Sequence, residues 1–154
     1  MVCPADDALT DHLARWSSWL PFADGAAQAP LAPGVYMARE GVTGPVVYVG
    51  KAGERRGQGI RGRLRVYSSG KAMVSGLGEA VTDRALADPD WLATRLTEAR
   101  AGTPLRATLW ARAALERVDL HVRWATCADG ATAAVLERAI LNTLREHDLW
   151  NRAR

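Results

Sequence analysis

One carboxylate in the C-terminal part of the chain lies where a charged residue is unusual. Four apolar residues lie at helical spacing around Glu137, namely Ala133, Ile140, Leu141 and Leu144. This spacing places Glu137 within the apolar stripe of a helix. Burying an isolated carboxylate is expensive, so such a group is paired with a basic side chain or bound to a cation. Glu137 is therefore a candidate metal ligand, and a salt bridge to one of the 20 basic residues is the alternative.

A second group with chemical potential consists of Arg63 and Tyr67. The two residues lie one helical turn apart and therefore on one face of a helix. A guanidinium presents a rigid fork of donors that suits a phosphate, and a neighbouring phenol can orient water or donate to an oxygen. A surface arginine packed on a tyrosine ring has the same spacing, so both interpretations stay open.

Two further tyrosines, Tyr36 and Tyr48, occupy equivalent positions in the short sequences GVY and YVG. Buried tyrosines usually contribute packing and one hydrogen bond. Hydrolysis of a phosphodiester, in contrast, needs a deprotonated water, a group that neutralises the developing charge, and in-line placement. Two phenols, an arginine and a carboxylate can meet these needs together with one divalent ion.

The basic charge of the chain is concentrated in one segment. The net charge is only +3, but between positions 51 and 71 the basic residues outnumber the single acidic residue, Glu54, by six. The basic residues are Lys51, Arg55, Arg56, Arg61, Arg63, Arg65 and Lys71. Such a cluster suits phosphate contacts, and a solvated basic helix is the alternative. We assign nucleic-acid binding to Arg55, Arg56, Arg61, Arg65 and Lys71.

Strands that would position these residues are predicted from alternation and composition. The runs GVYMARE (34–40) and GPVVYVG (44–50) are rich in β-forming residues and predict an antiparallel hairpin. Apolar and polar residues alternate from Val118 to Trp124, which predicts a third strand.

Helices are predicted on either side of these strands. Apolar spacing predicts an amphipathic helix over residues 7–20, and the segment up to residue 33 is a connector rich in proline and small residues. A glycine-rich basic loop precedes a short helix over 60–67. Residues 76–117 are predicted to be helical but carry no chemical motif, and a last helix is predicted over 131–146.

Length and composition favour one domain. A chain of 154 residues with 48% hydrophobic composition can enclose a single core without disulfides, and its two cysteines, Cys3 and Cys127, lack metal-ligand spacing. No run suits a signal peptide or a membrane span, so we expect a soluble, cytoplasmic protein. We expect an α/β fold for the single domain 1–154, with a small antiparallel sheet of about three strands flanked by helices. Residues 1–33 would form an N-terminal helix and connector, and residues 68–117 a helical insertion.

Three motifs together resemble the signature of the GIY-YIG nuclease superfamily: GVY at 34–36, YVGKA at 48–52 and RLRVY at 63–67. They are most similar to those of the N-terminal endonuclease domain of the bacterial excision repair incision subunit. The longer basic loop KAGERRGQGIRG resembles that of some restriction endonucleases of the superfamily. VLERAILNTL at 135–144 resembles the helix that carries the family's metal-binding glutamate, and Asn151 resembles an asparagine of its C-terminal tail.

The resemblance implies a role for each matching residue. Tyr36 would act near the nucleophilic water as general base or its relay, and Tyr48 would support it by hydrogen bonding. Because the pKa of a free tyrosine is about 10, Tyr36 needs a metal ion or a nearby positive charge to act as a base at neutral pH. Glu137 would hold one Mg²⁺ or Mn²⁺ ion, and Lys51 would help to place water, metal and phosphate.

The remaining matches concern the phosphate and its surroundings. The resemblance implies that Arg63 binds the scissile phosphate, and Arg61 and Arg65 are alternatives for this arginine. Tyr67 would assist in placing the reacting groups, and Asn151 would be a supporting residue.

The function implied by the resemblance is a metal-dependent endonuclease that hydrolyses phosphodiester bonds in DNA and leaves a 5′-phosphate and a 3′-hydroxyl. RNA is compatible with the same residues. One active site breaks both strands only in a dimer or by two binding events, so a homodimer is plausible. Two alternatives remain, a non-cleaving nucleic-acid-binding module of the same fold and a protein-interaction domain in which Glu137 is only ion-paired.

Overall fold

The computed structural model describes residues 4–152, and Cys3 lies outside this range. The chain divides into two compact units. The first unit extends to Arg65 and resumes at Asp119, and the second comprises Val66–Val118. The second unit contains the segment 68–117 that the sequence predicts to be a helical insertion.

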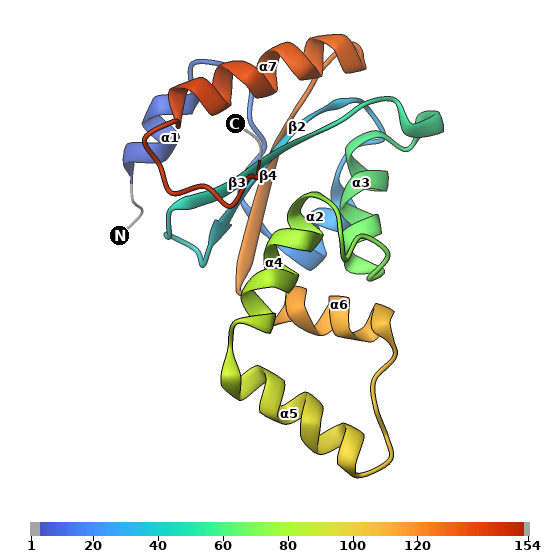
Figure 1. The fold of residues 1–154 in the computed structure, drawn as a ribbon. Helices are drawn as coiled ribbons and strands as arrows, with labels where there is room; N and C mark the ends of the chain where they lie inside the picture. Colours follow the sequence, from blue (N-terminus) through green and yellow to red (C-terminus); the bar gives the residue numbers. More distant parts are fainter. Residues whose placement is uncertain (1–3, 153–154) are drawn as a thin grey trace. The chain divides into compact units, whose positions relative to one another are not determined.

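A four-stranded antiparallel sheet forms the centre of the first unit (Figure 1). Its strands are β1 (Leu20–Pro21), β2 (Gly34–Glu40), β3 (Val46–Ala52) and β4 (Leu120–Thr126), in the order β1-β4-β2-β3. The expected α/β class with an antiparallel sheet is confirmed, as is the hairpin of β2 with β3. The expected number of about three strands is corrected to four, because a strand of two residues is too short to show alternation.

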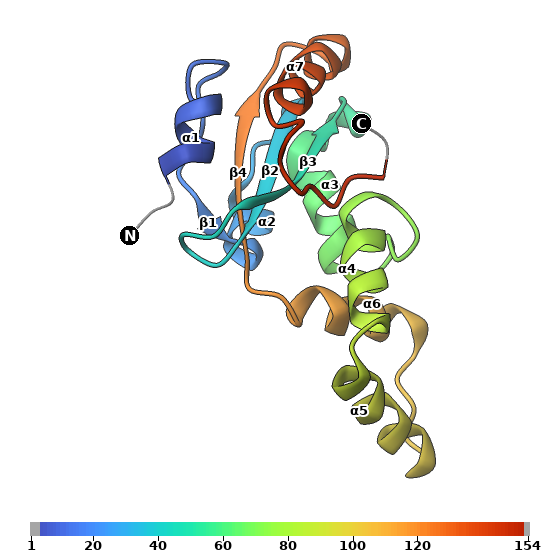
Figure 2. The ribbon, with the colours of Figure 1, turned by 60° about the vertical axis from the view of Figure 1, so that its left-hand side comes forward.

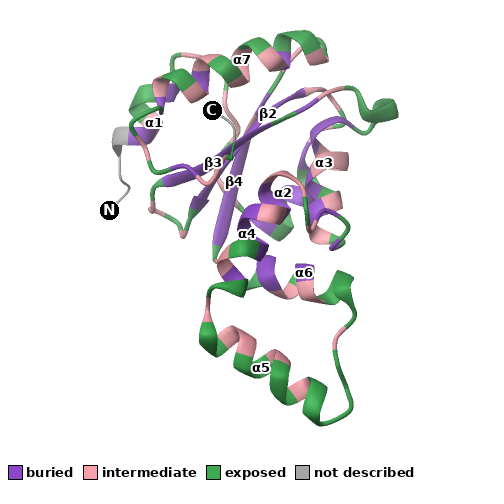
Figure 3. Ribbon diagram, in the orientation of Figure 1, coloured by how far each residue is buried: buried purple, intermediate pink, exposed green. Residues whose placement is uncertain are grey.

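Helix α7 (Gly130–Thr143) covers one face of the sheet. Its buried residues Ala133 and Ile140 form a core cluster with Val35, Met37 and Val49 of the hairpin. The register pairs Met37 with Val49, so these side chains project to the same side. In Figure 3 strand β2 is buried along most of its length, in keeping with its place between β3 and β4.

Helices α2 (Phe22–Gln28) and α3 (Gly59–Ser68) cover the opposite face of the sheet, as Figures 1 and 2 show. Gly25 of α2 packs so closely on Val122 that a Cβ atom would collide with that side chain, and a Cβ at Gly34 of β2 would lie 2.7 Å from Ile60 of α3. Both glycines therefore let a helix approach the sheet. The predicted helices over 60–67 and 131–146 are confirmed, with small shifts of their ends.

The helix predicted over residues 7–20 is wrong. Helix α1 spans only Pro4–Thr10, and the predicted connector contains α2. The side-chain Nε1 of Trp16 donates a hydrogen bond of 2.9 Å to the carbonyl oxygen of Thr10, which requires the chain to fold back after α1. Amphipathic spacing did not reveal this turn, because the cause is a residue of a distant strand.

That residue is Arg123 of β4, whose side chain is buried. Its Nη1 pairs with Asp11 Oδ1 at 2.9 Å, its Nη2 donates to Thr10 Oγ1 at 2.7 Å, and its guanidinium lies 4.7 Å from the centre of the Trp16 ring. A buried guanidinium must be paired and hydrogen-bonded. The end of α1 and the turn after it supply these partners.

The second unit is helical, as predicted for residues 76–117. It contains α4 (Gly76–Leu86), α5 (Pro89–Arg100) and α6 (Ala107–Glu116). The side chain of Asp88 caps α5 by accepting from the backbone nitrogens of Asp90 and Trp91. A hydrogen bond from Arg117 at 2.8 Å is the main reason why the pKa of Asp88 lies below its usual value. Among the described residues, no helix combines the length and apolar character that a membrane crossing requires.

We expect Arg123→Ala to destabilise the protein by about 2–3 kcal/mol. This lies below the usual cost of breaking a buried pair, because Asp11 is more than half exposed and can be solvated. Urea unfolding followed by circular dichroism measures the change. Arg15→Ala removes an exposed arginine of the same region and should change stability by less than about 0.5 kcal/mol. Equal effects of the two substitutions would contradict the role given to Arg123.

Candidate active site

Tyr36 and Tyr48 lie side by side on the face of the sheet that α2 and α3 cover. The register pairs Tyr36 with Gly50 and Tyr48 with Ala38, so the two tyrosines are diagonal neighbours on adjacent strands. Their ring centres are 6.3 Å apart and the ring planes differ by 25°. The exposed fractions are 1% for Tyr36 and 8% for Tyr48, so both phenols belong to the buried surface of the sheet.

Gly50, the glycine of YVG, makes room for the ring of Tyr36. A Cβ atom at this position would collide with Cζ and the hydroxyl oxygen of Tyr36. The ring therefore crosses the backbone of β3 at Gly50, and any other residue there would displace it. This role of Gly50 was not predicted from the sequence, although its position opposite Tyr36 in the hairpin is a usable signal.

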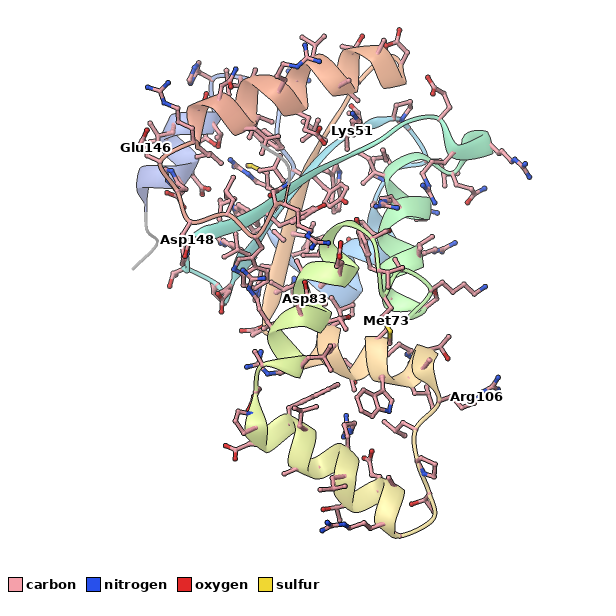
Figure 4. The ribbon with its side chains drawn as sticks, in the orientation of Figure 1. Lys51, Met73, Asp83, Arg106, Glu146 and Asp148 are labelled. Atoms are coloured by element: carbon pink, nitrogen blue, oxygen red, sulfur yellow. The ribbon has the colours of Figure 1, made fainter. Side chains whose placement is uncertain are left out.

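Glu137 and Lys51 form an ion pair on the other face of the sheet. Glu137 Oε1 lies 3.7 Å from Lys51 Nζ, and the side chains are 21% and 49% exposed. Lys51 follows Val49 by two residues and therefore projects from β3 toward α7, where Figure 4 labels it. Burial raises the pKa of the Glu137 carboxyl, and the positive charge of Lys51 opposes this shift.

A single divalent cation at Glu137 would have to be held mainly by water and substrate. Mg²⁺ commonly keeps several waters and binds one or two carboxylates together with phosphate oxygens. The described residues contain no group of three or more acidic, histidine or cysteine side chains that could hold a metal ion. Glu137 can supply one ligand, but the structure shows its carboxylate in the salt bridge that was the alternative to a metal site, with Lys51 as the partner.

Asn151 binds the backbone of β3 between the tyrosine and the glycine of YVG. Its Oδ1 accepts from the nitrogen of Val49 at 3.1 Å, and its Nδ2 donates to the carbonyl of Val49 at 2.7 Å. The neighbouring Trp150 donates its backbone nitrogen to the carbonyl of Val47 at 2.6 Å. The C-terminal tail therefore pairs with the edge strand and fixes the backbone that carries Tyr48 and Lys51.

The candidate residues form two groups, one on each face of the sheet. The tyrosine pair faces α2 and α3, whereas Lys51 faces α7 and pairs there with Glu137. Strand β3 contributes a residue to each group, Tyr48 to one and Lys51 to the other, because side chains of a strand alternate between the two faces of a sheet. β3 is the last strand of the sheet, and the C-terminal tail pairs with its outer edge at Val47 and Val49.

Arg63 and Tyr67 lie one turn apart in α3 but belong to different units. Arg63 is half-buried and lies on the helix that covers the tyrosine face. Tyr67 is buried, and its hydroxyl accepts a hydrogen bond of 3.4 Å from the backbone nitrogen of Leu77. Tyr67 therefore supports the start of α4 within the second unit, a contact that helical spacing did not indicate.

The basic residues proposed to bind nucleic acid differ in their surroundings. Arg61 donates its Nε to the carbonyl of Ala29 at 2.6 Å and so ties α3 to the segment after α2. Arg55, Arg56 and Arg65 are exposed in the first unit. Lys71 is exposed in the second unit.

Arg55 and Arg56 have backbone φ angles of 47° and 54°, in the left-handed region that non-glycine residues rarely adopt. Such a conformation costs roughly 1–2 kcal/mol per residue. Strained backbone in a basic loop beside charged residues is typical of a functional segment.

Comparison of the chain with protein-family models, curated proteins and solved structures finds no match in any of the three. The resemblance to the GIY-YIG superfamily therefore rests on the motifs of the chain. It stays a prediction.

We expect Gly50→Ala to destabilise the protein by about 1–3 kcal/mol, because the added methyl group displaces the buried ring of Tyr36. Thermal or urea unfolding measures the change. Gly53→Ala is the matched control, since the nearest atom to its added Cβ is the Cα of Gly130 at an ordinary distance of 4.0 Å. A Gly50→Ala protein as stable as the control would contradict this placement of Tyr36.

We expect Glu137→Gln to stabilise the metal-free protein at pH 7. Burial raises the pKa of Glu137 in the folded state above its value in the unfolded state. As the pH rises between these two values, the carboxyl ionises in the unfolded state first, so the folded state loses stability. The gain from the substitution should disappear below about pH 4, where the carboxyl is protonated in both states. Urea unfolding in EDTA from pH 4 to 7 tests this, with the exposed Glu40→Gln as control. A destabilised Glu137→Gln protein at pH 7 would show that the ion pair outweighs the burial cost.

Proposed function

We propose that the chain is a metal-dependent endonuclease of the GIY-YIG type that hydrolyses phosphodiester bonds in DNA. The observation that carries this proposal is the contact between Lys51 of YVGKA and Glu137 of VLERAILNTL, at 3.7 Å. Two motifs that are distant in the sequence thereby meet through their charged side chains. Burial opposes the charge of Glu137, and an ionisable group kept at such a cost is typical of functional sites.

Each side chain has a role in the proposed reaction. Glu137 would hold the divalent ion, which supplies a water of lowered pKa and positive charge for the phosphate. Tyr36 would accept the proton of the attacking water directly or through a relay, with Tyr48 stacked beside it. Lys51 would turn from Glu137 to the phosphate, and Arg63 would neutralise charge on the scissile group.

Asn151 would support this arrangement through the backbone of β3. Its two hydrogen bonds to Val49 hold the strand segment on which Tyr48 and Lys51 are placed. A cytoplasmic location, expected from the sequence, agrees with a DNA substrate. Cleavage of both strands at one place would require a homodimer or two successive binding events.

A second candidate function is a nucleic-acid-binding module that does not cleave. The low exposure of Tyr36, at 1%, favours it, because a base must reach the water that it deprotonates. The exposed Arg55, Arg56 and Arg65 would then bind phosphates without a reaction. Such a module predicts salt-sensitive binding and no product that depends on metal.

We expect the wild-type protein to nick supercoiled plasmid with Mg²⁺ or Mn²⁺ and to be inactive in EDTA. Glu137→Gln and Arg63→Ala should each lower the rate by at least about 100-fold, since each removes a group that stabilises charge in the transition state. Agarose gels of plasmid, and denaturing gels of labelled single-stranded DNA and RNA, measure cleavage and substrate class. Circular dichroism confirms that each variant is folded.

Glu40→Gln and Arg15→Ala are the matched controls, because they remove an exposed charge of the same sign elsewhere in the first unit. Both should cleave like the wild type. A folded wild-type protein that binds DNA but yields no metal-dependent product would favour the binding module. Activity retained in Glu137→Gln would disprove the site.

A further inference from the structure

Glu54 connects the basic loop to the helix that carries Glu137. It follows β3 directly after Gly53, and its carboxylate Oε1 accepts a hydrogen bond of 2.8 Å from the backbone nitrogen of Gly130, the first residue of α7. Its second carboxylate oxygen would lie 3.1 Å from a Cβ added at Gly130. The glycine at the start of α7 therefore lets the carboxylate approach the backbone closely.

The backbone of Glu54 closes the turn that presents the two exposed arginines. Its carbonyl oxygen accepts from the nitrogens of Gly57 at 2.9 Å and Gly59 at 3.1 Å. Arg55 and Arg56 lie within the turn that these two hydrogen bonds close, and both have the left-handed backbone conformation. Glu54 thus holds the strained turn with its main chain and α7 with its side chain.

Two carboxylates bind backbone nitrogens at the start of α7. Asp129 already fills the N-cap position and accepts from the nitrogen of Thr132 at 2.7 Å. Glu54 is also the single acidic residue among the basic residues from 51 to 71, where its negative charge disfavours a phosphate. Asp129 does not reach the nitrogen of Gly130, and Glu54 binds this group from the loop, so its side chain ties the loop to α7.

We propose that Glu54 is a positioning residue for substrate, which fixes Arg55 and Arg56 relative to α7 so that they contact phosphates of the strand being cut. The ligand class is a nucleic-acid backbone on either side of the scissile phosphate. This inference rests on the endonuclease function proposed above. Glu54 ties the loop to the first residue of α7, the helix that carries Glu137. Preorganised contacts bind more tightly than mobile ones.

The test measures binding of a fluorescent DNA duplex in EDTA by anisotropy. By charge alone, Glu54→Ala should tighten binding, since it removes a negative charge. The proposal predicts the opposite, an increase of Kd of at least about threefold, because ordering the loop must then occur on binding. Glu54→Gln loses the same charge but keeps an oxygen that can accept from Gly130, so its Kd should lie clearly below that of Glu54→Ala. Glu40→Gln, which removes a charge elsewhere in the first unit, should leave Kd within about twofold of the wild type.

A double-mutant cycle separates positioning from a general loss of stability. In an Arg55→Ala/Arg56→Ala background, Glu54→Ala should no longer weaken binding, because the groups that it positions are gone. Asp129→Ala removes the cap of α7 but leaves the hydrogen bond between Glu54 and Gly130, so it should affect Kd less than Glu54→Ala. Hydrogen exchange should increase at residues 53–59 in Glu54→Ala and not in Asp129→Ala.

The outcomes also distinguish this inference from the proposed function. If the wild type neither binds nor cleaves nucleic acid, both proposals fall. If the wild type binds and cleaves but Glu54→Ala tightens binding, or weakens it equally with and without the two arginines, only the role of Glu54 is disproved. In the cleavage reaction, Glu54→Ala should raise KM more than it lowers kcat.

Discussion

Strand β3 is bound by three separate parts of the chain, and the candidate site depends on this convergence. On one face the ring of Tyr36 crosses Gly50, on the other face Glu137 of α7 pairs with Lys51, and along the free edge Asn151 holds the backbone of Val49. An edge strand without these contacts would expose unpaired backbone groups. The same contacts that protect the edge also place the residues of YVGKA.

The ion pair of Lys51 with Glu137 is a compromise between burial and charge. Burial raises the pKa of Glu137, and the attraction of the half-exposed Lys51 offsets only part of the cost of removing the carboxylate from water. A glutamine at position 137 would avoid the cost, and an apolar residue would extend the stripe of Ala133 and Ile140. The structure shows one partner for this carboxylate, the ammonium group of Lys51 at 3.7 Å.

The parts of the structure that depend on local spacing were predictable from the sequence. The β2–β3 hairpin, α3 and α7 follow from alternation or helical periodicity over a few residues. The helix over 7–20 was predicted wrongly because Arg123, more than a hundred positions away, needs the partners that a break after Thr10 provides. The sequence likewise gave no signal for the bond of Arg61 to Ala29 or of Tyr67 to Leu77, since each partner is placed by tertiary packing.

The start of α7 and the loop after β3 both carry positive charge, and Glu54 lies between them. The N-terminus of a helix carries about half a positive elementary charge, so the start of α7 and the arginines after β3 favour an anion in the same region. Glu54 binds one backbone nitrogen of this helix start and neutralises part of that field. Its charge lowers the attraction for a phosphate, while its hydrogen bonds reduce the freedom of Arg55 and Arg56. Removal of Glu54 would therefore strengthen the attraction for a phosphate and free the two arginines at the same time, and these effects on binding have opposite signs.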